Sequence, residues 1–226
     1  MNKKVLIISS SPRKGGNSET LAAAFAEGAQ AAGHQAETVY LREKQIGYCK
    51  GCFACHVLGH CVLKDDAAAI AAKMHDADVL VFATPVYYYC VSGQLKTLLD
   101  RANPLYDSDY AFTKAYLLAT AAEDAPETFD GTEKAVQGWV DCFPRCTLTG
   151  TVFAGGIPQG SPGQDLGDHR AGQEVSGRRQ VLHFLWRLRG YRRRARRSMT
   201  AEWILIWRCS PPARSCLRRW SRRAIS

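Results

Sequence analysis

Residues 4–18 read KVLIISSSPRKGGNS, and this segment sets the architecture of the first part of the chain. Residues 5–8 are continuously apolar, which is typical of a strand buried on both faces of a parallel sheet. A polar loop with two glycines follows, and apolar residues then recur at helical spacing from Ser18 to about Ala32, ending at Gly33. A strand, a polar loop and a helix in this order predict the first unit of a parallel α/β sheet.

The same alternation continues along the chain. It predicts further strands at residues 36–41, 78–84, 115–120 and 147–154, and further helices at residues 65–75, 93–101 and 132–142. Right-handed crossovers place helices on both faces of such a sheet, so we expect a doubly wound, five-stranded parallel α/β fold. Ligands of these sheets bind beyond the carboxyl ends of the strands, which directs attention to the loops at 9–18, 84–93 and 120–131.

Charge divides the chain into two parts. Residues 1–156 hold 14 Lys and Arg against 17 Asp and Glu, whereas residues 157–226 hold 16 Arg, no Lys and only four acidic residues. The net charge of +9 therefore comes entirely from the tail. We expect one folded domain over residues 1–156, and an Arg-rich tail over residues 157–226 that is poorly ordered.

The polar loop after the first strand suits a phosphate group. Hydroxyls, glycines and an arginine lie where backbone N–H groups and the positive end of a helix converge on an anion. The loop lacks the Lys-Ser/Thr ending of a P-loop and the GxGxxG of a dinucleotide site, so a single terminal phosphate is favoured. The alternative is an ordinary polar connection in which Ser18 caps the helix.

The same loop resembles the FMN phosphate loop of the NADPH-dependent FMN reductase and iron–sulfur flavoprotein family, which has a flavodoxin-like fold. The resemblance covers about residues 3–155. It implies that the phosphate of FMN is held by Ser9, Ser11, Arg13, Asn17 and Ser18.

A second segment supports this resemblance. Thr84, Pro85, Val86, Tyr87 and Tyr88 resemble the family segment that lies along the isoalloxazine ring. A turn fixed by proline can aim N–H groups at the polar edge of the ring while aromatic side chains cover its faces. The tyrosines could equally be core or interface residues. Electron transfer needs no acid–base side chain here, so we assign no catalytic residue.

Four cysteines, Cys49, Cys52, Cys55 and Cys61, lie within thirteen residues. Disulfides are not expected in a chain that otherwise looks cytoplasmic. Closely spaced thiolates on a turning loop suit either an iron–sulfur cluster or structural zinc. The resemblance to the compact cysteine motif of iron–sulfur flavoproteins favours a [4Fe-4S] cluster. A cluster-free chain that keeps its thiols is the remaining alternative.

These features predict an FMN-dependent oxidoreductase or electron-transfer flavoprotein, with the cluster beside the flavin and NAD(P)H as electron donor. The alternatives are a cluster-free NAD(P)H-dependent FMN or quinone reductase, an FMN-binding module with structural zinc, and a nucleic-acid binder acting through the tail. We expect a small molecule or a protein as electron donor and acceptor, and no membrane or nucleic-acid partner. The resemblance further implies a homo-oligomer.

The tail departs from the family. Its sixteen arginines without lysine, and four of the five tryptophans of the chain, are typical of a GC-rich gene read in the wrong frame. We therefore hypothesise a frameshift near residue 157. The competing hypothesis is a basic arm for nucleic acid or an anionic membrane.

Overall fold

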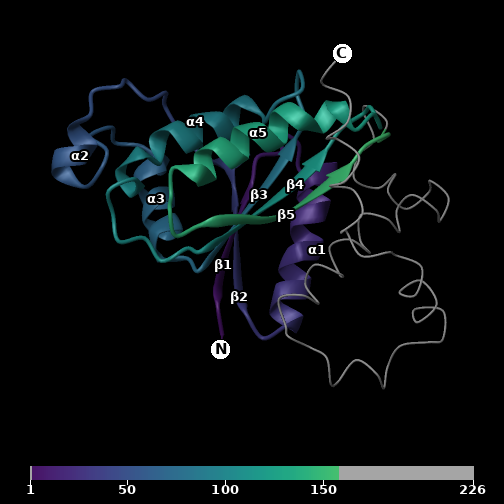
Figure 1. Ribbon diagram of the computed structural model, residues 1–226, viewed down its shortest axis with the longest axis horizontal. Coiled ribbons are helices and arrows are strands. Elements are labelled where there is room, and N and C mark those ends of the chain that lie inside the picture. The colour runs from purple at the N-terminus through teal and green to yellow at the C-terminus, as the bar shows by residue number, and fades with distance from the viewer. Residues whose placement is uncertain (1, 158–226) are drawn as a thin grey trace, which may run out of the picture. The chain divides into compact units, whose positions relative to one another are not determined.

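Five strands form one all-parallel sheet in the residues that the computed structural model describes, 2–157 (Figure 1). The strands are β1 (Lys4–Ser9), β2 (Gln35–Tyr40), β3 (Val79–Pro85), β4 (Lys114–Thr120) and β5 (Thr147–Ala154). Their order across the sheet is β2-β1-β3-β4-β5. This is the flavodoxin-like order, so the predicted fold class is confirmed. The predictions made for the Arg-rich tail and for a frame change concern residues outside the described range, from 158 onward.

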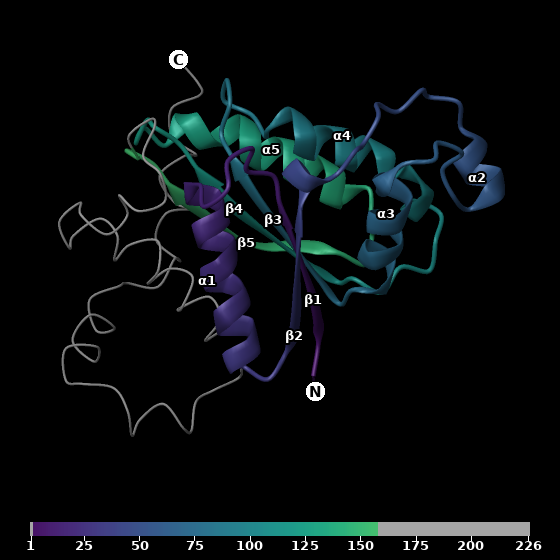
Figure 2. The same ribbon diagram turned by 180° about the vertical axis from the view of Figure 1, so that it is seen from behind.

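Helices cover both faces of the sheet. They are α1 (Asn17–Ala31), α2 (Ala54–Leu58), α3 (Asp66–Asp76), α4 (Gly93–Arg101) and α5 (Glu127–Asp141), with short 3-10 helices η1 (Leu41–Glu43) and η2 (Asn103–Leu105). Helix α1 lies on one face, and α3, α4 and α5 lie on the other, as the two opposite views show (Figures 1 and 2). The short helix α2 lies apart from these layers, on the long connection between β2 and α3.

Alternate residues of the strands enter two apolar clusters, one on each face. Val5 and Ile7 of β1 face α1, where they pack with Leu21 and Phe25. Leu6 and Ile8 of the same strand face the other three helices. Burial on both faces explains why these strands are continuous apolar runs in the sequence.

The structure corrects the predicted helix starts. Helix α5 begins at Glu127, five residues before the predicted start, and Gly131 lies inside it. The first helix begins at Asn17 with Gly16 as its N-cap, so Ser18 is not a capping residue. Asp65 does cap α3, because its carboxylate accepts a hydrogen bond of 3.0 Å from the N–H of Ala67. Helix α2, η1 and η2 were not predicted, since they are too short to show helical periodicity.

Candidate functional site

The loop between β1 and α1 is closed by its own hydrogen bonds. Ser11 Oγ donates to the carbonyl of Arg13 at 2.8 Å and accepts from the N–H of Arg13 at 3.3 Å. A Cβ on Gly16 would lie 2.5 Å from Ser11 Oγ, so this position has no room for a side chain. The loop is therefore a tight turn that ends at the N-terminus of α1, where helix N–H groups have no intrahelical carbonyl.

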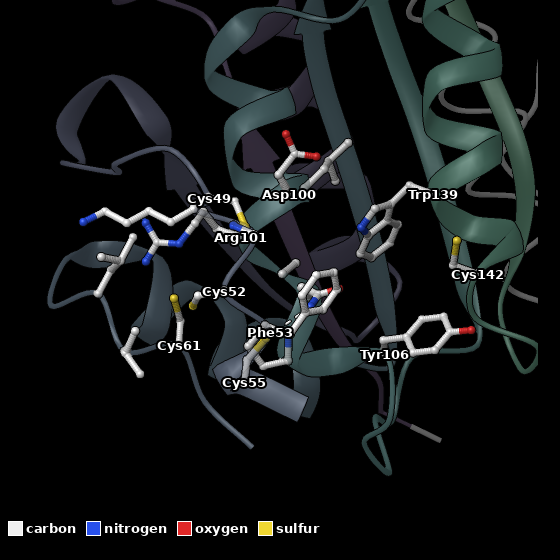
Figure 3. Close-up of a pocket in the computed structure, with 18 of the residues that line it drawn as sticks. Cys49, Cys52, Phe53, Cys55, Cys61, Asp100, Arg101, Tyr106, Trp139 and Cys142 are labelled. Atoms are coloured by element: carbon white, nitrogen blue, oxygen red, sulfur yellow. Dashed lines mark hydrogen bonds between the residues drawn. The ribbon is translucent and has the colours of Figure 1, made fainter. Parts of the chain in front are cut away.

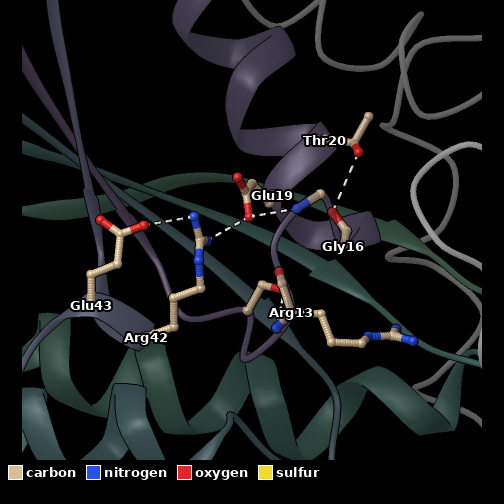
Figure 4. Close-up of polar contacts among 8 residues, drawn as sticks. Arg13, Gly16, Glu19, Thr20, Arg42 and Glu43 are labelled. Atoms are coloured by element: carbon tan, nitrogen blue, oxygen red, sulfur yellow. Dashed lines mark hydrogen bonds and ion pairs between the residues drawn. The ribbon is translucent and has the colours of Figure 1, made fainter.

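An ion-pair network lies on one side of this loop (Figure 4). Glu19 accepts from the N–H of Gly15 at 3.1 Å and pairs with Arg42 at 2.6 Å, and Arg42 also pairs with Glu43 at 2.9 Å. The Glu19 carboxylate thus already takes one loop N–H, and its charge is balanced by Arg42. Arg13 lies outside this network and makes no hydrogen bond or ion pair with another described residue through its side chain.

Two buried polar atoms of the loop have no partner in the structure. Ser9 Oγ and Asn17 Oδ1 are buried, and neither makes a hydrogen bond. By contrast, the neighbouring Ser10 Oγ donates to the carbonyl of Ala83 at 3.1 Å. A buried hydroxyl or amide without a partner is unfavourable by about 1–3 kcal/mol. Ser9 at the end of β1 and Asn17 at the start of α1 therefore leave hydrogen-bonding capacity for a ligand.

The segment after β3 is held by hydrogen bonds to its neighbours. Thr84 Oγ1 accepts from the N–H of Ser92 at 3.1 Å, which closes the loop from residue 84 to residue 92. The N–H of Val86 donates to the carbonyl of Thr120 at 2.8 Å, and so ties this segment to the end of β4. The hydroxyl of Thr84 and the N–H of Val86 are thus both engaged within the protein. The sequence analysis expected N–H groups of this turn to point at a ring. The N–H of Val86 is not available for that contact, because it already bonds to Thr120.

Tyr87, Tyr88, Tyr89 and Cys90 form a two-residue hairpin. Tyr87 and Cys90 exchange backbone hydrogen bonds of 2.9 and 3.1 Å. Both central residues, Tyr88 and Tyr89, have positive φ, at 49° and 61°. Non-glycine residues in this conformation are strained by roughly 1–2 kcal/mol each. The Tyr88 side chain is 101% exposed, so this strained turn presents an aromatic ring to solvent.

Helix α5 supports the hairpin from behind. A Cβ on Gly131 would overlap the carbonyl oxygen of Tyr89, so only glycine fits at this point of the helix. The hydroxyl of Tyr89 donates to Glu123 Oε2 at 3.2 Å, and Thr128 donates to the same oxygen at 2.9 Å. The charge of Glu123 raises the pKa of Tyr89. Neither Gly131 nor Glu123 was singled out in the sequence, because each acts through a contact with a distant residue.

The four cysteines line one hollow of about 460 Å³, together with residues from the ends of α4 and α5 (Figure 3). Left-handed backbone conformations at Gly51, Phe53 and Gly59 turn the loop around this space. Cys49 and Cys52 are exposed, and Cys55 and Cys61 are half-buried. His56, in contrast, makes a hydrogen bond of 2.7 Å with Asp107.

A buried ion pair anchors this loop to the domain. Arg101, whose side chain is 0% exposed, pairs with Asp65 through bonds of 2.6 and 2.9 Å and donates to the carbonyl of Gly47 at 2.7 Å. The hydrogen bonds that Arg101 donates to Asp65 lower the pKa of Asp65 and raise the pKa of Arg101. The beginning and the end of the cysteine loop are therefore joined through one guanidinium.

The cysteine side chains surround the hollow without meeting at one point. Among residues 2–157, no three Cys, His, Asp or Glu side chains are placed to hold a single metal ion. Four thiolates of a cubane cluster each bind a different iron, and so stand farther apart than four ligands of one zinc ion. A hollow lined by all four thiols offers the type and the number of donors that a cubane cluster would need.

The two candidate sites lie at opposite ends of α4 and α5. Both helices start near the carboxyl ends of the strands, beside the hairpin, and their last turns line the cysteine hollow (Figure 1). Nine residues of α4 span about 13 Å and fifteen residues of α5 about 22 Å, at 1.5 Å per residue. The structure therefore separates the two predicted sites on one chain, whereas the sequence analysis expected the cluster beside the flavin.

The model of the NADPH-dependent FMN reductase family matches residues 3–140. An iron–sulfur flavoprotein from Methanosarcina thermophila is 32% identical over 157 residues, which are 68% of this chain and 81% of that protein. One from Archaeoglobus fulgidus is 37% identical over 101 residues, which are 45% of this chain and 46% of that protein. The chain thus spans about half the length of some of the curated relatives it matches.

Solved structures show the same fold at low identity. An azoreductase from Bacillus anthracis has a TM-score of 0.60 and 17% identity, over 82% of this chain and 99% of that one. Among the described residues, no helix is both long and apolar enough to span a membrane.

Proposed function

The chain belongs to the NADPH-dependent FMN reductase and iron–sulfur flavoprotein family, and from this premise we propose that it is an FMN-dependent oxidoreductase that takes electrons from NAD(P)H. The observation that carries the proposal is the buried, unpartnered hydroxyl of Ser9, at the end of β1 and before the loop that leads to α1. When bound, FMN supplies a ring that accepts a hydride as two electrons and releases them singly.

We assign the phosphate of FMN to the loop of Ser9, Ser11, Arg13, Asn17 and Ser18. Ser9 would donate its unpaired hydroxyl there, and Asn17 would donate through its amide N–H rather than through the unpaired oxygen. Ser18 is buried in the first turn of α1, and Arg13 is exposed and lacks a charge partner among the described residues. Helix N–H groups and a free guanidinium both favour an anion.

We assign the ring of FMN to the segment of Thr84, Pro85, Val86, Tyr87 and Tyr88. The hairpin stands at the carboxyl end of β3, and Gly131 and Glu123 contact it at Tyr89. Tyr87 and Tyr88 would cover one face of the ring and exclude water from it. No side chain is required to add or remove a proton in this proposal.

We further propose that Cys49, Cys52, Cys55 and Cys61 hold a [4Fe-4S] cluster. Their common hollow and the iron–sulfur flavoproteins among the relatives support this assignment. Electrons would pass between the FMN site of one copy and the cluster site of another copy. The reason is that the two sites of a single chain lie at opposite ends of α4 and α5.

Exposed apolar side chains support a homo-oligomer. They gather on the cysteine loop, at Tyr48, Phe53, Val57, Leu58 and Val62, and on the hairpin. Such patches are typical of surfaces that another protein covers. Light scattering on the full chain, loaded with its cofactors, should give a mass of more than one copy. A mass of one copy would contradict this part of the proposal.

The test is anaerobic purification of the full chain, followed by a visible spectrum and by flavin, iron, sulfide and zinc determinations per chain. We expect flavin bands with a broad shoulder, about four irons and about four sulfides. Flavin without iron would favour the cluster-free reductase, and zinc would favour the FMN-binding module with a structural metal. A chain that binds no FMN would overturn the proposed function.

A further inference from the structure

Two of the four cysteine sulfurs already receive hydrogen bonds from the protein. The amide Nδ2 of Asn103 donates to Cys55 Sγ at 3.1 Å, and the N–H of Gly51 donates to Cys49 Sγ at 3.5 Å. Arg101 lines the same hollow as Cys61. Asn103 and Arg101 come from outside the cysteine loop, at η2 and at the end of α4.

Asn103 stands at the point where α2 meets η2. Its amide also lies 3.1 Å from His56 Nε2, and His56 in turn bonds to Asp107. Asn103 therefore has two separable contacts on α2, one with a sulfur and one with the neighbouring ring. The second contact could by itself dock α2, and it offers a matched control for the first.

One N–H donor of Arg101 has no hydrogen-bond partner. Its guanidinium is fully buried and lines the hollow, and two of its nitrogens bond to Asp65 and Gly47. Its Nε is buried and has no hydrogen-bond partner in the structure. An unpaired buried N–H of a charged group is costly, so its place beside the thiols indicates an acceptor that arrives with a ligand.

Donors to sulfur matter for redox chemistry. A hydrogen bond to a thiolate ligand stabilises the reduced cluster, which carries the larger negative charge, more than the oxidised one. Donors of this kind are among the factors that set the reduction potential of iron–sulfur clusters. They act more strongly in a half-buried hollow than in water, because the local dielectric is lower.

We propose that Asn103 and Arg101 are the side-chain donors that raise the reduction potential of the cluster held by Cys49, Cys52, Cys55 and Cys61. This inference rests on the cluster assignment made under the proposed function. It adds two positioning residues that lie outside the cysteine motif and more than forty positions after its first cysteine.

The experiment is a spectroelectrochemical titration of the reconstituted full chain, comparing wild type with Asn103→Ala, Asn103→Asp and His56→Ala. Asn103→Ala should lower the midpoint potential enough to change the reduced-to-oxidised ratio about tenfold, which is about 59 mV for one electron. Asn103→Asp should lower it further, since it replaces a donor by a negative charge. His56→Ala removes the contacts of this ring with Asn103 and Asp107 but leaves the bond from Asn103 to Cys55 Sγ, so it should titrate like wild type.

Arg101→Lys provides a second measurement, with folding checked by circular dichroism. It keeps the positive charge but removes Nε, so its midpoint should also fall; if this variant fails to fold, the Asn103 series decides. Wild-type potentials in both Asn103 variants would overturn the inference while leaving the cluster assignment intact. An equal shift in His56→Ala would overturn it as well, by showing that Asn103 acts through docking α2. A wild-type chain that retains no iron or sulfide would overturn both proposals.

Discussion

Ser9 and Ser10 are neighbours in sequence and both are buried, but only one has its hydroxyl satisfied. Ser10 Oγ donates to Ala83, whereas Ser9 Oγ has no partner. The difference arises because successive residues at the end of β1 point to opposite sides of the chain. Ser10 therefore has a structural contact, and Ser9 keeps a free hydroxyl for the phosphate-binding role that we propose.

We predict opposite effects for the two serines. Ser9→Ala should raise the dissociation constant of FMN by about tenfold or more, because a hydrogen bond to a charged group contributes about 1.5–3 kcal/mol. The FMN-free chain should not lose stability. Ser10→Ala should destabilise the FMN-free chain by about 1 kcal/mol and leave FMN affinity unchanged. Fluorescence titration and urea unfolding measure both quantities, and equal FMN affinities for Ser9→Ala and wild type would contradict the assignment.

Asp65 has two roles, as the cap of α3 and as the partner of the buried Arg101. Removing its charge leaves an uncompensated guanidinium, which is destabilising by about 3–5 kcal/mol. We predict a loss of this size for Asp65→Asn at pH 7, measured by urea unfolding. Asp65→Asn combined with Arg101→Met should recover part of it; a double variant as unstable as the sum of both single changes would contradict the coupling.

The pH dependence of this pair has a defined sign. The folded pKa of Asp65 is lowered, so its contribution to stability is fully present above the unfolded value of about 3.9. That contribution is lost as pH falls through the lower, folded pKa. The stability difference between wild type and Asp65→Asn should therefore be constant from pH 7 to pH 5 and shrink below about pH 4. A difference that grows on acidification would contradict the sign.

Helix α5 carries two glycines with different surroundings. Gly131 faces the carbonyl of Tyr89, and Gly138 has no atom within 4 Å of where a Cβ would lie. The first glycine allows the tyrosine hairpin to approach the helix closely. The second contributes only backbone freedom, which weakens a helix by roughly 0.5–1 kcal/mol relative to alanine.

We predict that Gly131→Ala destabilises the chain by about 1–3 kcal/mol, as overpacking usually does, and weakens FMN binding by displacing the hairpin. Gly138→Ala is the matched control on the same helix, and should stabilise the chain by roughly 0.5–1 kcal/mol without altering FMN binding. Thermal unfolding and flavin titration of both variants measure this. A Gly131→Ala chain with unchanged stability would show that the hairpin does not depend on this contact.

Over the whole chain, the folded domain and the tail differ in charge. The tail, with sixteen arginines and four acidic residues, follows a domain with a slight acidic excess. Under the frameshift hypothesis, resequencing near codon 157 should reveal an inserted or deleted nucleotide. The measured mass of the native protein should also differ from the mass calculated for the 226-residue sequence. An intact frame with a matching mass would contradict it. DNA binding that falls steeply with salt would then support the basic arm.

Much of the domain was determined by the sequence alone. The strand, loop and helix at residues 4–33, and the apolar runs that follow, predicted five parallel strands and the loops that carry a ligand, because burial on both faces imposes a local pattern. The start of α5 was misplaced, since Gly131 looks like a helix breaker unless its contact with Tyr89 is known. The serines, the tyrosine segment and the cysteines could be named as candidates, because local composition marks them.

Only the tertiary structure decided which of these groups meet. It separated the cysteine hollow from the carboxyl ends of the strands, and it brought Arg101 and Asn103 into contact with residues 54 and 48 positions away in sequence. It also distinguished Ser9 from Ser10 by their partners. The physical reason is the same in each case: periodicity and composition record what a residue's own segment buries, whereas a hydrogen bond between distant segments depends on how the crossovers place them.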